Sequence, residues 1–554
     1  MAEKTLGRLQ KGTTGSLEFG IYGFNGGLNV KSVPQQVGDN DLTVALNVYL
    51  STSGGVRMRN GITKHGASLG ASPVIGLVRF FQTINAGLPV SPPTVATLAQ
   101  VGGNLYNADT ATPIGSIGGT TAAPMVTARA QDANDPHIAG LTDVLVICTG
   151  SGGPYVYDGA NLYTPAGWAD AASAAWCTIV NGVVWFGGIP GNPRTVYGTG
   201  DGIVTSFESL PGYNVFLMSH PVTGLCTLGN GASSTLVVGM ITGIATISGT
   251  GPNNYVLQEI PSVDGVAAGR TMVTYDGLPG SSMFTDPGVL FFLGRSGVYQ
   301  FNGYSPPSQM SIKVEPWILN DPYVPGYPMS ENRNLSFSWV YNNRLHIAYC
   351  SNSFVPNTIL VFDFIVGGWT VLQPTPGMSS ATLLDAPGDP APSPCVVGSS
   401  TSGQLYNWDI EPGAGNVATD DGATIQTAFQ TKYFPLGVPG TNKMLTRAYP
   451  EFFLTGPIQG NFYAQTDYGN IVNAHLLATT PQTGYLWDVG QWDQAIWSAN
   501  LVFQPYGPPA SRVDFDETQG NTFAFGVTTS GGTAPYIFGG MTGVFKQLGR
   551  SSAA

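Results

Sequence analysis

Four short segments of this chain are near-copies of one another, and in each of them aromatic or apolar residues occupy alternate positions. Two of them, residues 153–159 and 297–303, share the frame Gly-x-Tyr-x-aromatic followed by Asp or Asn and then Gly. The other two, residues 103–109 and 403–409, share a closely related frame. Alternation suits a half-buried strand, and the flanking glycines suit tight turns. Each segment is therefore predicted to close a β-hairpin, as a copy of one repeated unit.

The repeats recur at the spacing of a β-propeller, in which a blade takes roughly 40 to 50 residues. We predict an all-β protein with a propeller of six or seven blades over residues 60–411. Three successive strands of one blade are expected at 344–349, 358–363 and 368–372, whereas the proline-rich stretch 374–398 is interpreted as a loop excursion. The blade markers are Tyr106, Tyr157, Tyr197, Ile244, Phe301, Phe362 and Trp408.

The regions that flank the propeller have other patterns. Residues 1–59 are predicted to form an N-terminal arm and platform segment. Within it, residues 39–47 are the best helix candidate, because the acidic start can cap a first turn and the apolar residues share one face. Longer alternating strands follow residue 412, so residues 412–554 are assigned to a C-terminal β-sandwich domain. The N-terminal arm could add to this platform.

Composition narrows the classes of function. The 554 residues include 75 Gly and 41 Pro but only 10% charged residues, which fits many short strands. A net charge of −12 without any basic run argues against tight binding of nucleic acid. No apolar stretch approaches the ~18 residues of a membrane helix, and the first residues lack the pattern of a secretory signal. Assembly in a host cytoplasm is expected.

Three sets of residues each allow two interpretations. Arg57 and Arg59 could touch DNA, or could pair with carboxylates of a neighbouring strand or subunit, which we favour. Residues 132–137 could bind a cation, but the segment lacks the glycine and glutamate of a calcium loop, so a solvated turn is favoured. The aromatic residues of the repeats could stack on sugars, but alternation favours a role in the core.

The chain lacks the local motifs of common catalytic sites. It has no Ser-x-Asp-x-Gly-x-x-Trp box, no Gly-x-Ser-x-Gly elbow, no phosphate-binding Walker loop and no recognisable pair of carboxylates. We therefore predict that the protein is not an enzyme and has no catalytic residues, no cofactor and no metal ligands.

An ordered set of motifs resembles the propeller-type tail nozzle and tail hub proteins of short-tailed bacteriophages. The resemblance runs from about Phe24 to Arg550, and the order of the motifs carries it more than any one of them. The motifs are residues 24–29, the segment around Asn47, Arg57-x-Arg59-x-Gly61, residues 193–201, Asp420-Asp421-Gly422 and residues 430–432.

The resemblance implies a structural protein of the virion that stabilises packaged DNA. Such a protein forms a ring of six copies below the portal and adaptor, closes the DNA exit channel and conducts DNA at ejection without binding it tightly. Its partners would be the adaptor ring and tail fibre or spike proteins. The alternative function is a phage-tail propeller that binds or cleaves host glycans.

Overall fold

The computed structural model divides the chain into two compact units. Unit 1 comprises Met1–Thr63, Leu360–Thr375 and Asp409–Ala554, and unit 2 comprises Lys64–Ile359 and Pro376–Trp408. The structure describes residues 10–11, 16–33, 36–120, 124–165, 167–199, 214–229, 234–251, 254–262, 264–275, 288–385, 393–410, 418–436, 440–454, 458–469, 471–479, 504–505, 513–529 and 535–550.

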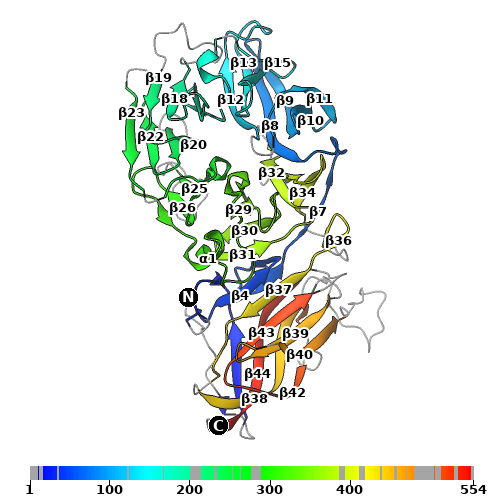
Figure 1. Ribbon diagram of the computed structural model, residues 1–554. Coiled ribbons are helices and arrows are strands. Elements are labelled where there is room, and N and C mark those ends of the chain that lie inside the picture. The colour runs from blue at the N-terminus through cyan, green and yellow to red at the C-terminus, as the bar shows by residue number, and fades with distance from the viewer. Residues whose placement is uncertain are drawn as a thin grey trace, which may run out of the picture. The chain divides into compact units, whose positions relative to one another are not determined.

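Unit 2 is a β-propeller (Figure 1). Its first five blades are separate four-stranded antiparallel sheets in which strand order follows the sequence. The strands are β8 (Val74–Asn85), β9 (Leu88–Val101), β10 (Asn104–Asn107) and β11 (Thr112–Ser116) in blade 1; β12 (Val126–Asp132), β13 (Thr142–Cys148), β14 (Tyr155–Tyr157) and β15 (Leu162–Tyr163) in blade 2; β16 (Trp176–Val180), β17 (Val183–Gly187), β18 (Thr195–Gly198) and β19 (Asn214–Leu217) in blade 3; β20 (Val222–Leu228), β21 (Thr235–Met240), β22 (Ile244–Ser248) and β23 (Val256–Ile260) in blade 4; and β24 (Val273–Tyr275), β25 (Val289–Leu293), β26 (Val298–Phe301) and β27 (Ser308–Gln309) in blade 5.

Two further blades complete the ring. Blade 6 begins with β28 (Phe337–Tyr341) and β29 (Arg344–Tyr349) in unit 2, and its sheet continues through β30 (Thr358–Asp363) and β31 (Gly368–Leu372), most of whose residues fall in the unit 1 segment Leu360–Thr375. Blade 7 has the order β32 (Met378–Leu383), β33 (Cys395–Ser399), β34 (Leu405–Ile410) and β7 (Gly61–His65). A strand from the start of the chain thus closes the last blade, and the His65 and Asn407 side chains hydrogen-bond there at 2.9 Å.

The first strands of the blades contact one another in sequence, from β8 through β12, β16, β20, β24, β28 and β32 back to β8. The predicted all-β fold and its six or seven blades are therefore confirmed. All seven marker residues lie on the third strand of a blade, so Tyr157 and Phe301 occupy equivalent positions in blades 2 and 5. The interpretation of residues 374–398 as a loop excursion is wrong at its beginning, where Met378–Leu383 forms β32, the first strand of blade 7.

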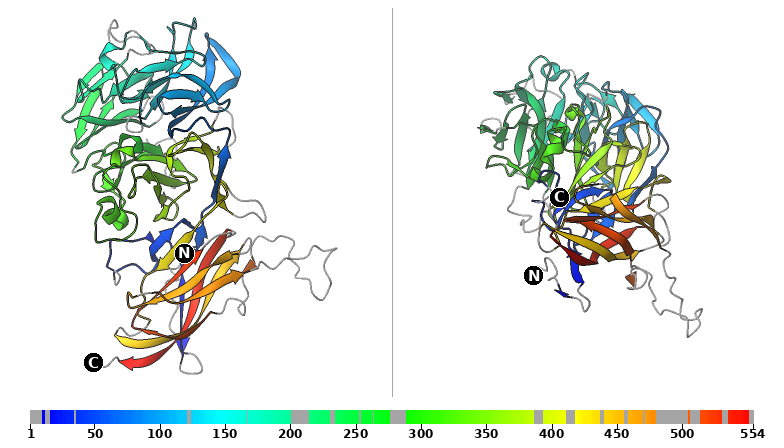
Figure 2. Two further views of the ribbon diagram at one scale, coloured as in Figure 1. Left: turned by 45° about the vertical axis from the view of Figure 1, so that its right-hand side comes forward. Right: turned by 60° about the horizontal axis from the view of Figure 1, so that its bottom comes forward.

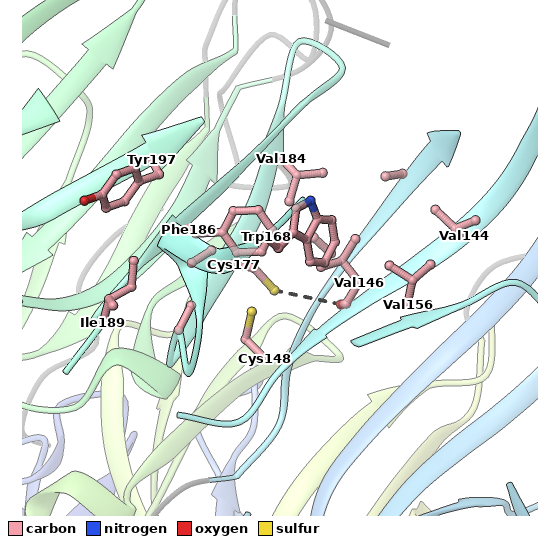
Figure 3. Packing of buried hydrophobic residues seen from close by; sticks show 14 residues of the cluster. Val144, Val146, Cys148, Val156, Trp168, Cys177, Val184, Phe186, Ile189 and Tyr197 are labelled. Atoms are coloured by element: carbon pink, nitrogen blue, oxygen red, sulfur yellow. Dashed lines mark hydrogen bonds between the residues drawn. The ribbon is translucent and has the colours of Figure 1, made fainter. Parts of the chain in front are cut away.

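Apolar side chains fill the spaces between neighbouring blades. Between blades 2 and 3, for example, Val146, Cys148 and Trp168 pack with Cys177 and Phe186 (Figure 3). The Cys177 thiol donates to the Val146 carbonyl oxygen at 3.8 Å, and burial raises the pKa of the Cys148 thiol, as does Cys177 beside it. These two cysteines therefore serve the core as small apolar residues with weak donors.

An arginine bridges the propeller ring. Arg270 lies in the short 3-10 helix η3 (Gly269–Thr271) that precedes blade 5. Its guanidinium donates to the carbonyl oxygens of Ile75 in blade 1, at 3.0 Å, and Ser379 in blade 7, at 2.9 Å, and lies 5.2 Å from the Phe337 ring centroid in blade 6. Burial lowers the pKa of Arg270 to about 10. One side chain thus connects four of the blades.

Among its described residues, unit 2 also contains four other short helical turns. These are η1 (Ala169–Ala171), η4 (Ile312–Val314), α1 (Glu315–Ile318) and η5 (Arg333–Leu335). The last three lie in the excursion between β27 and β28, so they stand next to blades 5 and 6 in the chain.

Unit 1 contains two large sheets, beside the β35–β36 hairpin that pairs with β7. One joins the long strands β38 and β44 with β1, β2, β5, β6, β41 and β42, and the other joins β3, β4, β37, β39, β40 and β43 with β31. Figure 2 shows β38 and β44 running side by side. The strands are β1 (Gln10–Lys11), β2 (Leu17–Tyr22), β3 (Gly27–Leu28), β4 (Asp41–Leu46), β5 (Val48–Leu50), β6 (Val56–Met58), β35 (Thr419–Asp420), β36 (Ala423–Thr424), β37 (Thr427–Thr431), β38 (Thr441–Leu454), β39 (Ile458–Thr466), β40 (Ile471–Thr479), β41 (Gln504–Pro505), β42 (Val513–Gly520), β43 (Phe523–Thr529) and β44 (Tyr536–Arg550).

Aromatic side chains from both sheets pack face to face and make unit 1 a sandwich. Phe19 of β2 lies 5.7 Å from Phe525 of β43, and Phe429 of β37 lies 4.9 Å from Phe538 of β44, measured between ring centroids. Because Phe19 belongs to the first segment of the chain, the N-terminal region is part of this sandwich, as expected.

The predicted helix over residues 39–47 is wrong. The segment forms strand β4, which pairs with β37 on one side and with β3 and β31 on the other. Leu42 and Ala45 are fully buried. The residues that would have formed one helical face are instead held by strand pairing, so tertiary structure overrides the local capping signal.

Candidate functional site

Unit 2 carries a pocket of about 550 Å³ at blades 4 and 5. Thr223 comes from the first strand of blade 4, Ile241 from its β21–β22 turn and Arg295 from the β25–β26 turn of blade 5. The excursion before blade 6 supplies Leu319, Asn320, Met329, Ser330, Glu331, Arg333 and Asn334. Turns of two blades and a long connection therefore build the walls, and such segments commonly carry binding sites on a rigid scaffold.

Positive charge gathers in this pocket. The Arg333 guanidinium donates to the carbonyl oxygens of Arg295 and, at 2.6 Å, of Ile318 at the end of α1. Burial lowers the pKa of Arg333; Asp264 opposes this shift and the neighbouring Arg295 adds to it. Because both arginines line the same pocket, an anion bound there would offset their like charges.

Two acidic residues lie near the pocket, one buried behind its wall and one exposed on its lining. Asp264 is buried, and its carboxylate accepts hydrogen bonds from the Ser296 backbone N–H at 2.7 Å and hydroxyl at 2.8 Å. Glu331 is exposed and lines the pocket itself. With hydroxyl and amide side chains beside these charges, the lining can bind a polar anionic molecule.

Three of the sequence motifs meet elsewhere, in unit 1. Arg59 is buried and forms a two-pronged ion pair with Asp420, with N–O distances of 2.8 and 2.5 Å. Its Nε donates to the Asn47 side-chain oxygen at 3.0 Å, and Asn47 in turn donates to the Gln426 carbonyl oxygen at 2.7 Å. The structural interpretation of Arg59 is therefore confirmed, and we call these residues (Asn47, Arg59, Asp420) the platform node.

The backbone around the platform node is equally constrained. At Gly61, two residues beyond Arg59, an added Cβ would lie 2.1 Å from the Thr419 carbonyl oxygen. Arg57, in contrast, is half-buried and donates to the Asn60 side chain at 2.9 Å. Arg59 and Gly61 therefore shape the platform, and the buried Arg59 side chain is fully engaged by its neighbours.

The possible cation segment, residues 132–137, forms a turn held by its own carboxylates. Asp135 accepts from the backbone N–H groups of His137 and Ile138 and from the Tyr163 hydroxyl at 2.7 Å. Within the ranges that the structure describes, no three His, Cys, Asp or Glu side chains gather closely enough to hold a metal ion. The turn is thus explained by hydrogen bonding within blade 2.

The repeat aromatics belong to the core. Tyr157 and Phe301 are buried in the clusters between blades, and the Tyr157 hydroxyl donates to the Gly159 carbonyl oxygen at 2.8 Å. The core interpretation is confirmed for these positions. Sequence analysis missed the Arg295 and Arg333 pocket, because its residues come from separate turns and no local spacing brings them together.

Comparison with known proteins adds the fold alone. No family model matches the chain, and neither does any curated protein. Among solved structures, the chain is similar to BBS1N in complex with ARL6DN, with a TM-score of 0.28 and 11% identity over 56% of this chain and 95% of that one. It is also similar to an exo-beta-1,3-galactanase from Phanerochaete chrysosporium with galactose, with a TM-score of 0.24 and 10% identity over 66% of this chain and 95% of that one. A glycoside hydrolase family 43 arabinoxylan arabinofuranohydrolase from Bacillus subtilis matches with the same TM-score of 0.24 and 10% identity, over 87% and 96% of the two chains.

These comparisons correct the expectation that the chain is not an enzyme. The similar propellers include glycoside hydrolases by name. Glycan cleavage by two carboxylates requires only that they converge in space, and they can come from distant segments without a local motif. Missing motifs were therefore no ground for excluding catalysis.

The resemblance to phage tail proteins is untouched by the comparisons and stays a prediction. Among the described residues, no helix has the length and apolar character to cross a membrane.

Proposed function

We propose that this protein is a structural component of a short phage tail, in which the sandwich of unit 1 makes the assembly contacts. The observation that carries the proposal is the platform node. Asn47, Arg59 and Asp420 lie in three of the separated motifs that resemble tail nozzle and hub proteins, and they meet in one buried network. The motifs that carry the resemblance therefore contain residues that stabilise the sandwich. This supports the proposal that the protein shares its combination of platform and propeller with the tail nozzle and hub proteins.

The strands that end the described sheets of unit 1 also support assembly. Among the described strands, β40 ends the order of its sheet, and β1 ends the order of the other. Exposed edges present backbone donors and acceptors that neighbouring copies can cover. In this proposal six copies surround the tail axis and contact the adaptor ring above, with DNA passing between copies.

Antibody labelling tests this proposal. Antibodies raised against the propeller, residues 64–359, are applied to purified virions that contain the protein and imaged by electron microscopy. Labelling at the tail, with a copy number near six by quantitative mass spectrometry, supports the proposal. Absence of the protein from washed virions, or labelling confined to the capsid, would exclude it.

A second candidate is recognition or cleavage of host glycans. The pocket of blades 4 and 5 favours it, because its charges and amides suit a polar ligand. Incubation of the purified protein with host polysaccharide separates the possibilities. Release of reducing ends supports cleavage. Retention of the protein on immobilised polysaccharide without such release supports recognition. If neither is observed, only the structural role is left.

A further inference from the structure

The pocket of blades 4 and 5 has a charge opposite to that of the protein. Its lining contains two arginines, Arg295 and Arg333, and one acid, Glu331, whereas the whole chain has a net charge of −12. In an acidic protein, a concave site with a positive balance attracts anions to one place. The ligand is therefore expected to be anionic.

Arg333 is positioned to bind through its remaining donors. A guanidinium has five N–H groups, and two of its nitrogens here donate to backbone carbonyl oxygens, those of Arg295 and Ile318. These bonds fix the orientation of the planar group, so a ligand would lose little side-chain entropy by binding it. Among the described residues, neither Arg333 nor Arg295 forms an ion pair with a carboxylate. The buried Asp264 carboxylate raises the pKa of Arg333 but is itself hydrogen-bonded to Ser296, so both guanidinium groups keep N–H donors that a ligand can use.

The remaining walls suit a sugar. Asn320 and Asn334 supply amide groups that can pair with hydroxyls, and the Thr223 hydroxyl, which donates to the Val266 carbonyl oxygen at 2.8 Å, can still accept. Ile241 and Leu319 are 39% and 50% exposed at the pocket and offer an apolar surface to the C–H face of a ring. The volume of about 550 Å³ lies within the roughly 300–1,000 Å³ of small-molecule sites.

We propose that this pocket binds a carboxylate-bearing sugar, such as a uronic acid unit of an acidic polysaccharide. The carboxylate lies between Arg295 and Arg333, because guanidinium groups bind carboxylates through parallel hydrogen bonds. The amides orient the ring hydroxyls, and Glu331 accepts from a further hydroxyl. This inference goes beyond the structural role proposed above and holds whether or not the protein belongs to a virion.

Calorimetry with the full chain tests the inference. The probes are trigalacturonate, its fully methyl-esterified form and inorganic phosphate. The ester keeps the sugar rings and their hydroxyls but loses the negative charges. Trigalacturonate is expected to bind at least tenfold more tightly than either of the others. Equal affinity for the ester, tighter binding of phosphate, or no binding of trigalacturonate would overturn the proposal.

Matched variants locate the site. Arg295→Gln and Arg333→Gln should each weaken trigalacturonate binding by tenfold or more, whereas Lys546→Gln, which removes one exposed positive charge from β44, should leave it unchanged. Arg295 is exposed, and its side chain donates no hydrogen bond to another described residue, so its variant remains informative if Arg333→Gln fails to fold. Unchanged affinity in the Arg295 variant, or an equal loss in the Lys546 variant, would refute the assignment.

Discussion

Arg59 and Asp420 are buried together, with 1% and 3% of their side-chain surfaces exposed, so each depends on the other. Removing one partner leaves the other charge without compensation, which typically costs about 3–5 kcal/mol. We expect Arg59→Met and Asp420→Leu each to lower the free energy of unfolding of unit 1 by that amount. Urea unfolding followed by tryptophan fluorescence and hydrogen exchange in β37 would measure it.

The double variant provides the control. Arg59→Met combined with Asp420→Leu removes both charges at once, and apolar replacement of a buried pair is often nearly neutral. The double variant should therefore be more stable than either single variant. Additive losses, or single losses below about 1 kcal/mol, would contradict a buried ion pair as the centre of the platform node.

His346 makes unit 2 sensitive to acid. The ring is buried, stacked on Trp339 with centroids 4.7 Å apart, and burial together with the nearby Arg344 lowers the pKa of His346 from 6.5 to about 3. The unfolded chain therefore binds a proton between pH 6.5 and 3 that the folded chain rejects. This contribution to stability is complete above pH 6.5 and is lost as the pH falls toward 3, by up to about 1.4 kcal/mol per pH unit.

A variant isolates that contribution from the acid titration of other groups. His346→Phe keeps an aromatic ring beside Trp339 but cannot be protonated. Between pH 6.5 and 4, wild-type protein should lose more stability than this variant, whereas His220→Gln, at an exposed histidine, should follow the wild type. Thermal unfolding across this range would decide the point, and parallel curves for wild type and His346→Phe would rule the effect out.

At the scale of elements, the bridge made by Arg270 joins blades that are not neighbours in the chain. Arg270→Met would leave the Ile75 and Ser379 carbonyl oxygens without their charged donor. The expected cost is about 3 kcal/mol, with faster hydrogen exchange in β8 and β32. Arg194→Met is the matched control, because Arg194 donates to one carbonyl oxygen, that of Met218, at 3.1 Å. An equal loss in both variants would contradict the bridging role.

The sequence predicted the blades well because each third strand carries a local signal. Tyr157, Phe301 and the other markers alternate with neighbours beside turn glycines, and the structure places every one of them on the same strand of its blade. Local signals failed at β4 and β32. Capping residues and prolines indicate the conformation that a segment prefers in isolation. In the folded protein, β4 and β32 are instead stabilised by pairing with other strands, and the main partner of β4, β37, lies far away in the chain.

The candidate site was beyond the reach of sequence patterns for the same reason. Arg295 and Arg333 belong to a turn and to an excursion, and each looks like an ordinary surface residue by itself. The platform node was anticipated only in part. Arg59 was expected to pair with a carboxylate, but its partner lies 361 residues away and no spacing rule identifies Asp420.

At the scale of the whole molecule, charge determines how the protein meets DNA. The net charge of −12 repels phosphates, and Arg270 is occupied by carbonyl oxygens. We expect no measurable binding of duplex DNA at physiological salt, since binding depends on cations that release counterions. Electrophoretic mobility shifts at micromolar protein would test this. A shift that disappears as salt rises would contradict it.

The order of the strands along the chain has a consequence for biosynthesis. Every strand of unit 2 has left the ribosome soon after Trp408 is made, whereas the sandwich of unit 1 needs β44, which ends at Arg550. At roughly 5–20 residues per second, about 140 further residues take on the order of 10–30 s to translate. The propeller can therefore fold while β2 still waits for β44, and β4 for β37. During that interval Phe19 and Leu42, both buried in the finished protein, are exposed on the nascent chain, where trigger-factor-type chaperones would bind.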